Sequence, residues 1–230
     1  MNSQPSLWVA QWRETILPYG FDDWDRQSLR TRITGKIHRG GSLNDRLAEA
    51  IFRLQTQENK LAGAAARMQQ HDREMFDKCV RAQISKDSTR AAMYANECAQ
   101  IRKMAKVTLQ CQLALMQAAL RLETAREFGN IASMMAPVAS VVRSVQGHIT
   151  GIIPEVGYEL TEIGEVLNNV VDDIGGPLAS ESGIHASGEE AQRILSEAST
   201  LAEHRMQQHF PDLPTGPTPV PQRVAEQGFQ

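Results

Sequence analysis

The sequence contains few aromatic residues, and it contains no long apolar run. Aromatic residues make up 5% of its 230 residues, whereas Ala, Leu, Met and Gln are plentiful. That mix favours long helices. No apolar run reaches the roughly 18 residues that a membrane span needs. The stretch from Met1 to Pro18 contains Glu14 and no basic residue before its apolar part, so it lacks the pattern of a secretory signal.

Paired cysteines are also missing. Cys79, Cys98 and Cys111 form no C-x-x-C motif. An odd number of thiols without a secretory signal indicates reduced cysteines in the cytosol. All three lie at apolar positions of helical patterns, which predicts small buried side chains. We therefore expect a cytoplasmic protein.

The net charge of −3 conceals opposite charges in the two parts of the chain. Residues 1–126 hold 20 Lys and Arg against 13 Asp and Glu, a net of +7. Residues 127–230 hold 4 against 14, a net of −10. This division indicates an anionic partner for the first part, and it equally allows the acidic part to fold back onto the basic part.

One long helix is predicted to follow Gly40-Gly41. Residues Ser42 to Asp45 match a capping box in which Asp replaces the usual Glu. Neither proline nor a turn cluster occurs from there to about Ile84. A helix of about 40 residues is roughly 60 Å long. Its apolar residues recur every seven positions, at Leu47, Leu54, Leu61, Met68 and Met75.

A second long helix is predicted over about 88–128, after a short break at residues 85–88. Its apolar positions are three and four residues apart, at Ala91, Tyr94, Cys98, Ile101, Ala105, Leu109, Leu113, Met116 and Leu120. Two long helices joined by so short a break should form an antiparallel hairpin.

Shorter elements are predicted after Gly129. A third helix covers about 130–148 and contains Pro137, which should start or kink it. An acidic helix covers about 155–174, with an apolar face made of Val156, Leu160, Ile163, Leu167, Val170 and Val171. A further amphipathic helix covers about 188–208, with a face made of Ala191, Ile194, Leu195, Ala198, Leu201 and Ala202.

The tail that follows is rich in proline. Residues 210–221 contain five of the ten prolines, so this segment should be extended. The predicted fold class is all-α: an elongated protein with a long antiparallel helical hairpin, shorter C-terminal helices and a disordered Pro-rich tail. We divide the chain into an aromatic and basic segment (1–40), a helical core (41–174), a linker (175–187), a short amphipathic helix (188–209) and the Pro-rich tail (210–230).

No catalytic constellation is evident. Gly35-Lys36 ends like a phosphate-binding loop, but Arg30 stands where that motif needs Gly. His204 and His209 are five residues apart, rather than the four of a zinc-binding HExxH motif. We therefore expect no enzyme activity, no cofactor and no metal.

Residues 1–25 hold all three tryptophans of the chain. Trp8 and Trp12 lie at near-helical spacing with Ile16 and Leu17. Because Trp favours the boundary between lipid headgroups and water, these two residues are a candidate membrane anchor. The alternative is that these aromatic side chains pack on the body of the protein.

The strongest pattern is basic. No acid occurs between Asp25 and Asp45, a stretch that contains Arg26, Arg30, Arg32, Lys36 and Arg39. Cations also recur every seven residues, at Arg32, Arg39, Arg46, Arg53, Lys60 and Arg67, and the part from Arg46 to Arg67 lies on the first long helix. The row could be the solvated flank of a coiled coil, although such flanks usually mix Glu with Lys. An anionic membrane surface fits the row better than nucleic acid, because the rod has few aromatic residues and the whole chain is acidic.

This order of elements resembles the ESCRT-III superfamily, particularly the archaeal cell-division (CdvB-type) members. The resemblance covers roughly residues 26–221. The tail adds to it, because it looks like the family's extended MIT-interacting motif, in which Pro alternates with apolar residues. The matching positions are Phe210, Pro211, Leu213, Pro214, Pro217, Pro219, Val220 and Pro221.

The resemblance implies a filament subunit that polymerises with itself or with related subunits on membranes. It also implies disassembly by a Vps4-like AAA ATPase whose MIT domain binds the tail. The expected location is the inner face of the cell membrane at the division site. A coiled-coil scaffold or adaptor without membrane contact is the alternative, and a nucleic-acid-associated helical protein is the least favoured.

Overall fold

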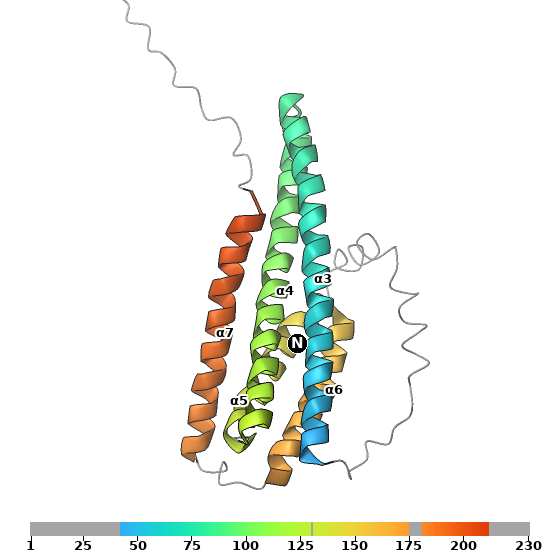
Figure 1. Cartoon of the computed structure of the whole chain (residues 1–230). Coiled ribbons are helices and arrows are strands. Elements are labelled where there is room, and N and C mark those ends of the chain that lie inside the picture. Colours follow the sequence, from blue (N-terminus) through green and yellow to red (C-terminus); the bar gives the residue numbers. More distant parts are fainter. Residues whose placement is uncertain (1–41, 130, 175–180, 212–230) are drawn as a thin grey trace, which may run out of the picture.

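The computed structural model describes residues 42–129, 131–174 and 181–211 (Figure 1). These residues form the helices α3 (Leu43–Ile84), α4 (Ser88–Phe128), α5 (Ile131–Ile149), α6 (Pro154–Ile174) and α7 (Glu181–His209), and they contain no strand. The all-α fold class is therefore confirmed. Figure 1 shows α3 and α4 as a long antiparallel hairpin, with the shorter helices beside the part that holds the start of α3 and α7 reaching past its middle.

The hairpin begins at the capping box that the sequence predicted. The Ser42 hydroxyl accepts a hydrogen bond from the Asp45 amide at 3.3 Å, and the Asp45 carboxylate accepts one from the Ser42 amide at 3.1 Å. At the other end, Ser85, Lys86 and Asp87 connect the two helices. Lys86 has a φ of 61°, and Asp87 caps α4 by accepting a hydrogen bond from the Arg90 amide at 3.0 Å.

The heptad row of α3 lies in the interface with α4. Leu47, Leu54 and Leu61 are fully buried, and Met68 and Met75 are nearly so. By contrast, α4 is buried on several sides, because it also packs against α5 and α7. Its apolar residues therefore do not form one stripe. Leu120, which was expected on the apolar face, is 53% exposed.

Helices α5 and α6 pair with each other, and α6 also packs on α3. The predicted apolar face of α6 is confirmed, since Val156, Leu160, Ile163, Leu167 and Val170 are buried and Val171 is half-buried. Pro154 occupies the first helical position of α6, where its missing amide costs nothing. Pro137 lies inside α5 instead of starting it.

Helix α7 packs against α4 and α5. Its buried face consists of Ala191, Ile194, Ala198 and Ala202, whereas Leu201 is 45% exposed. The helix begins at Glu181, inside the stretch that the sequence indicated as a linker. Gly188 lies within it, and helical interactions on both sides carry the chain through a residue of low helix propensity.

Candidate membrane-contact and assembly surfaces

The row of cations on α3 changes its surroundings along the helix. Arg46 and Arg53 are half-buried beside α6, whereas Lys60 and Arg67 are exposed and make no ion pair within the described residues. A seven-residue repeat falls about 20° short of two full turns, so the row winds slowly around the helix. The winding moves the later cations away from α6.

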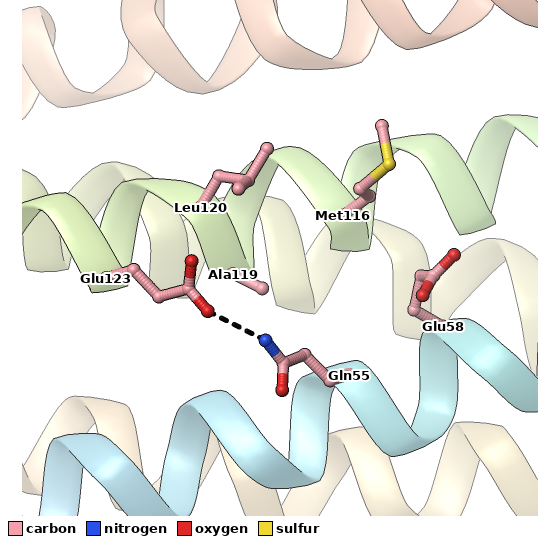
Figure 2. A pocket seen from close by; sticks show the side chains of 6 residues that line it. All are labelled: Gln55, Glu58, Met116, Ala119, Leu120 and Glu123. Carbon is pink, nitrogen blue, oxygen red and sulfur yellow. Dashed lines mark hydrogen bonds between the residues drawn. The ribbon is translucent and has the colours of Figure 1, made fainter.

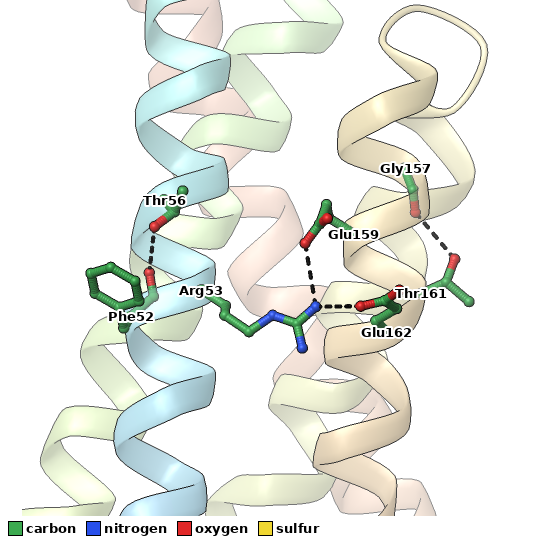
Figure 3. A network of polar contacts seen from close by, with 7 residues as sticks. All are labelled: Phe52, Arg53, Thr56, Gly157, Glu159, Thr161 and Glu162. Carbon is green, nitrogen blue, oxygen red and sulfur yellow. Dashed lines mark hydrogen bonds and ion pairs between the residues drawn. The ribbon is translucent and has the colours of Figure 1, made fainter. Parts of the chain in front are cut away.

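Arg53 lies at the centre of the contact with α6 (Figure 3). Its Nη2 atom is 2.7 Å from an oxygen of Glu162 and 3.3 Å from an oxygen of Glu159. Burial alone would lower the pKa of Arg53, but the hydrogen bonds and charges of Glu162 and Glu159 outweigh it, so the pKa is raised above its ordinary value. Near the end of α6, Asp173 pairs with Arg46. The acidic helix thus covers the first two described cations of the row.

The outer side of α4 carries a second set of charged and polar contacts, made to α7. Lys106 donates to Glu203 at 2.8 Å, and Gln110 donates to the Ser199 hydroxyl at 2.9 Å. Arg121 pairs with Glu190. These contacts join residues 69 to 97 positions apart and attach α7 to the second half of α4.

A buried ion pair lies between the helices of the hairpin. Asp72 is fully buried, and Arg102 donates to both of its carboxylate oxygens, at 2.8 and 3.0 Å. The ring of Phe210, which follows α7, lies 5.8 Å from the guanidinium carbon of Arg102, within the range of a cation–π contact. Gln69 donates to the backbone oxygen of His209 at 3.4 Å. The end of α7 is therefore fixed to the middle of the hairpin.

Sequence reasoning missed this pair, although the sequence contains a signal for it. Asp72 stands four residues after Met68 and three before Met75, so it lies on the apolar face of α3. A carboxylate on a buried helix face needs a partner. Nothing in the order of residues identifies Arg102 as that partner, because the pairing depends on the register of the hairpin.

A shallow groove of about 120 Å³ lies between α3 and α4 (Figure 2). Gln55 donates to Glu123 across it at 2.7 Å, and Met116, Ala119 and Leu120 form its apolar lining. Glu58, which also lines it, accepts a hydrogen bond from Gln112 at 2.9 Å. The groove is too small and too open to hold a cofactor, since ligand pockets usually measure about 300–1,000 Å³.

Comparison with known proteins identifies the family. The chain is 43% identical over 173 residues to "Cell division protein B1" of Sulfolobus acidocaldarius, covering 75% of this chain and 80% of the relative. It is 31% identical over 192 residues to "Cell division protein B" of the same organism, covering 84% and 72%. The chain belongs to the archaeal CdvB family of ESCRT-III-type subunits. No family model matches this CdvB-type sequence, and no solved structure matches it.

Several of the site residues predicted for a CdvB-type subunit lie outside the described part of the chain. They are Trp8, Trp12, Arg26, Arg30, Arg32, Lys36, Arg39, Leu213, Pro214, Pro217, Pro219, Val220 and Pro221. Among the described tail residues, Pro211 is exposed but Phe210 is only 8% exposed. Phe210 therefore packs on the hairpin in this conformation, and it is not available there as an anchor for a partner.

The described residues of the CdvB-type chain contain no helix long and apolar enough to span a membrane. Within the same residues, no group of three or more His, Cys, Asp or Glu side chains is arranged to hold a metal ion. The three cysteines are free and buried.

Proposed function

We propose that this CdvB-type chain is a filament subunit that polymerises on anionic membranes and remodels them during cell division, at the inner face of the cell membrane. The main support is the row of cations on α3 of the rod-shaped hairpin. The acidic helix α6 pairs with two of these cations. The names of its two Sulfolobus relatives, both cell division proteins, support the process.

The membrane-binding surface would be the row of cations. Arg46, Arg53, Lys60 and Arg67 form its described part, Arg26 to Arg39 would extend it, and Trp8 and Trp12 would anchor it. Each cation near an anionic lipid surface contributes about 1 kcal/mol. Because Glu159, Glu162 and Asp173 already pair with two of these cations, α6 and the lipid would compete for them. The membrane would then favour a conformation in which α6 has left α3.

Release of α6 would also promote assembly. Its apolar face, centred on Leu160, Ile163 and Leu167, is buried against the rest of the chain. A released α6 would need another apolar surface, which a neighbouring copy or a related subunit can provide. The same movement would thus make the chain competent for lipid and for a homo- or hetero-polymer.

Disassembly would depend on the Pro-rich tail. Leu213 and Val220 would be apolar anchors in a segment that its prolines keep extended, so binding in a groove would cost little ordering entropy. Phe210 would join them only after it leaves the hairpin. The partner would be the MIT domain of a Vps4-like AAA ATPase. A peptide of residues 205–224 should bind such a domain with only micromolar affinity, because the motif is short. Weak binding is sufficient, since a filament repeats the motif and so supplies avidity. The change Leu213→Asp should abolish this binding while leaving polymerisation intact.

Co-sedimentation with vesicles tests the membrane step. The variant Lys60→Glu/Arg67→Glu should lose binding to anionic vesicles by about tenfold or more. The variant Lys103→Glu/Arg126→Glu makes the same change in net charge at two exposed cations of α4, and it should lose less. Equal losses would contradict a specific role for the row. Assembly of the full chain without any vesicle binding would favour the coiled-coil scaffold.

A further inference from the structure

The hairpin continues past the other helices to a free end (Figure 1). In this end, residues 78–96, the described helices pack mainly on each other through a small cluster of Cys79, Ala82 and Ala91, with Tyr94 and Ala95 at its edge. Tyr94 also borders the cluster that contains Phe210. Small side chains allow close approach, and the turn is tied by the Lys86 amide to the Gln83 oxygen at 2.9 Å and by the Asp87 amide to the Ala82 oxygen at 3.0 Å. The end is therefore narrow, convex and well defined.

This end carries a net positive charge, although Asp77 and Glu97 flank it. Between Lys78 and Asn96 the chain has four cations and a single acid, Asp87. Asp87 is already engaged, because it caps α4 and lies 3.3 Å from the Arg90 guanidinium. The four cations are exposed: Lys78, Arg81, Lys86 and Arg90. Unlike Arg46 and Arg53, none of them pairs with α6, so this positive surface is available in the described conformation.

The same end exposes apolar side chains. Ile84, the last residue of α3, is 77% exposed, and Met93, in the second turn of α4, is 65% exposed. Phosphates of nucleic acid would use the cations but leave Ile84 in water. An anionic bilayer surface accepts both kinds of group, with cations at the phosphates and apolar side chains at the acyl boundary. A convex end also fits a deformable lipid surface better than it fits a preformed protein groove.

We propose that the hairpin end, residues 78–96, is a second membrane-contact site that binds anionic phospholipid headgroups. Ile84 enters the headgroup boundary, and the four cations contact lipid phosphates. This inference rests on the proposed function at a membrane, but it adds a site that does not require release of α6. The subunit can therefore first meet the membrane through the end of its hairpin and later lie along its row of cations.

A fluorescent reporter tests where the membrane touches the chain. An environment-sensitive dye is attached to the full-length chain at Ile84→Cys, or at Phe128→Cys as the matched control. Phe128 is 79% exposed at the opposite end of α4, and the native cysteines are buried. With vesicles of equal parts phosphatidylcholine and phosphatidylglycerol, emission from position 84 should shift to the blue, and emission from position 128 should not. Pure phosphatidylcholine vesicles should give no shift.

Charge variants locate the contact independently of the dye. Arg81→Ser/Lys86→Asn should weaken vesicle binding by at least about tenfold, whereas Arg126→Ser/Arg143→Asn, with the same change in charge, should weaken it less. If the chain co-sediments but position 84 keeps its aqueous emission, the hairpin end is not the contact and the proposed function stands. If the chain does not co-sediment at all, the membrane function fails as well. A shift at position 84 with duplex DNA but not with vesicles would overturn the proposal in favour of nucleic acid.

Discussion

Arg53 of α3 donates a hydrogen bond of 2.7 Å to Glu162 of α6, which lies 109 residues further along the chain. This pair joins the basic part of the sequence to the acidic part. The two side chains are 21% and 46% exposed, so solvent screens their attraction. The docked position of α6 therefore depends on the burial of its apolar face together with several weak ion pairs, and this combination is suited to a reversible change.

A change at Glu162 should loosen α6 and strengthen vesicle binding. Glu162→Lys replaces the shorter of the two ion pairs of Arg53 by repulsion and leaves only the longer contact with Glu159, so Arg53 becomes easier for lipid phosphates to reach. We expect faster amide hydrogen exchange in α6 and several-fold tighter binding to anionic vesicles. Hydrogen exchange and co-sedimentation measure the two effects.

Glu165→Lys is the matched control, because Glu165 is exposed on the same helix and makes no ion pair within the described residues. It adds the same positive charge without touching Arg53. If both variants gain the same vesicle affinity, the gain comes from net charge, and α6 does not mask the row.

The buried Asp72–Arg102 pair should be important for stability. Asp72→Ala leaves a mostly buried guanidinium without its carboxylate, and breaking such a pair costs about 3–5 kcal/mol. Replacement of both partners by apolar residues, as in Asp72→Leu/Arg102→Met, should recover most of that loss. Urea unfolding gives the free energies. Asp77→Ala, at an exposed site on the same helix, is the control, and an equal effect of Asp77→Ala and Asp72→Ala would refute the importance of the pair.

Phe210 should hold the end of α7 on the hairpin. Phe210→Ala removes the ring from Arg102 and from the apolar cluster that contains Met68, Met75 and Ile101. Amide hydrogen exchange in the last two turns of α7 should become faster, whereas Pro211→Ala, at an exposed neighbour, should not change it.

Because Phe210 is buried in the full chain, an MIT domain should bind the peptide of residues 205–224 more tightly than it binds the intact protein. Equal affinities would show that Phe210 is not needed for recognition.

The thiols should be unreactive in the folded protein. Burial raises the pKa of Cys98 and of Cys111 from 9.0 to about 12, with the charge of Asp72 adding to the effect at Cys98. At pH 8, a disulfide reagent should label the native chain at least about tenfold more slowly than the unfolded chain. Above pH 9 these two thiols lose their protons in the unfolded chain but keep them in the folded one, so the free energy of unfolding should fall as the pH rises towards 12. Equal labelling rates in the two states would contradict this.

The sequence predicted most of the helices because local signals coincide with their ends. Ser42 and Asp45 form the predicted cap, Ser88 begins α4, and Pro154 begins α6. The heptad from Leu47 to Met75 gave the buried face of α3, since every residue of the row lies in the interior of the protein. In α4 the same reasoning placed Leu120 on the apolar face, but α4 contacts three helices and its apolar residues point in several directions.

The contacts of the candidate sites were harder to predict. The charge difference between the two parts of the chain indicated that the acidic part could cover the basic part, and α6 does lie on α3. A net charge does not specify which residues pair, however, so it could not show that Arg53 contacts Glu162 while Lys60 remains exposed. The position of Phe210 against Arg102 was also hidden, because it depends on where α7 lies along the hairpin.

Negative-stain electron microscopy of the full chain, mixed with anionic or with neutral vesicles, tests the central claim most directly. The account predicts filaments on the anionic vesicles, accompanied by tubulation or narrowing of the membrane, and neither on the neutral ones. Glu162→Lys should form these filaments at lower protein concentration. Anionic vesicles that remain bare and spherical with both proteins would contradict a membrane-remodelling role.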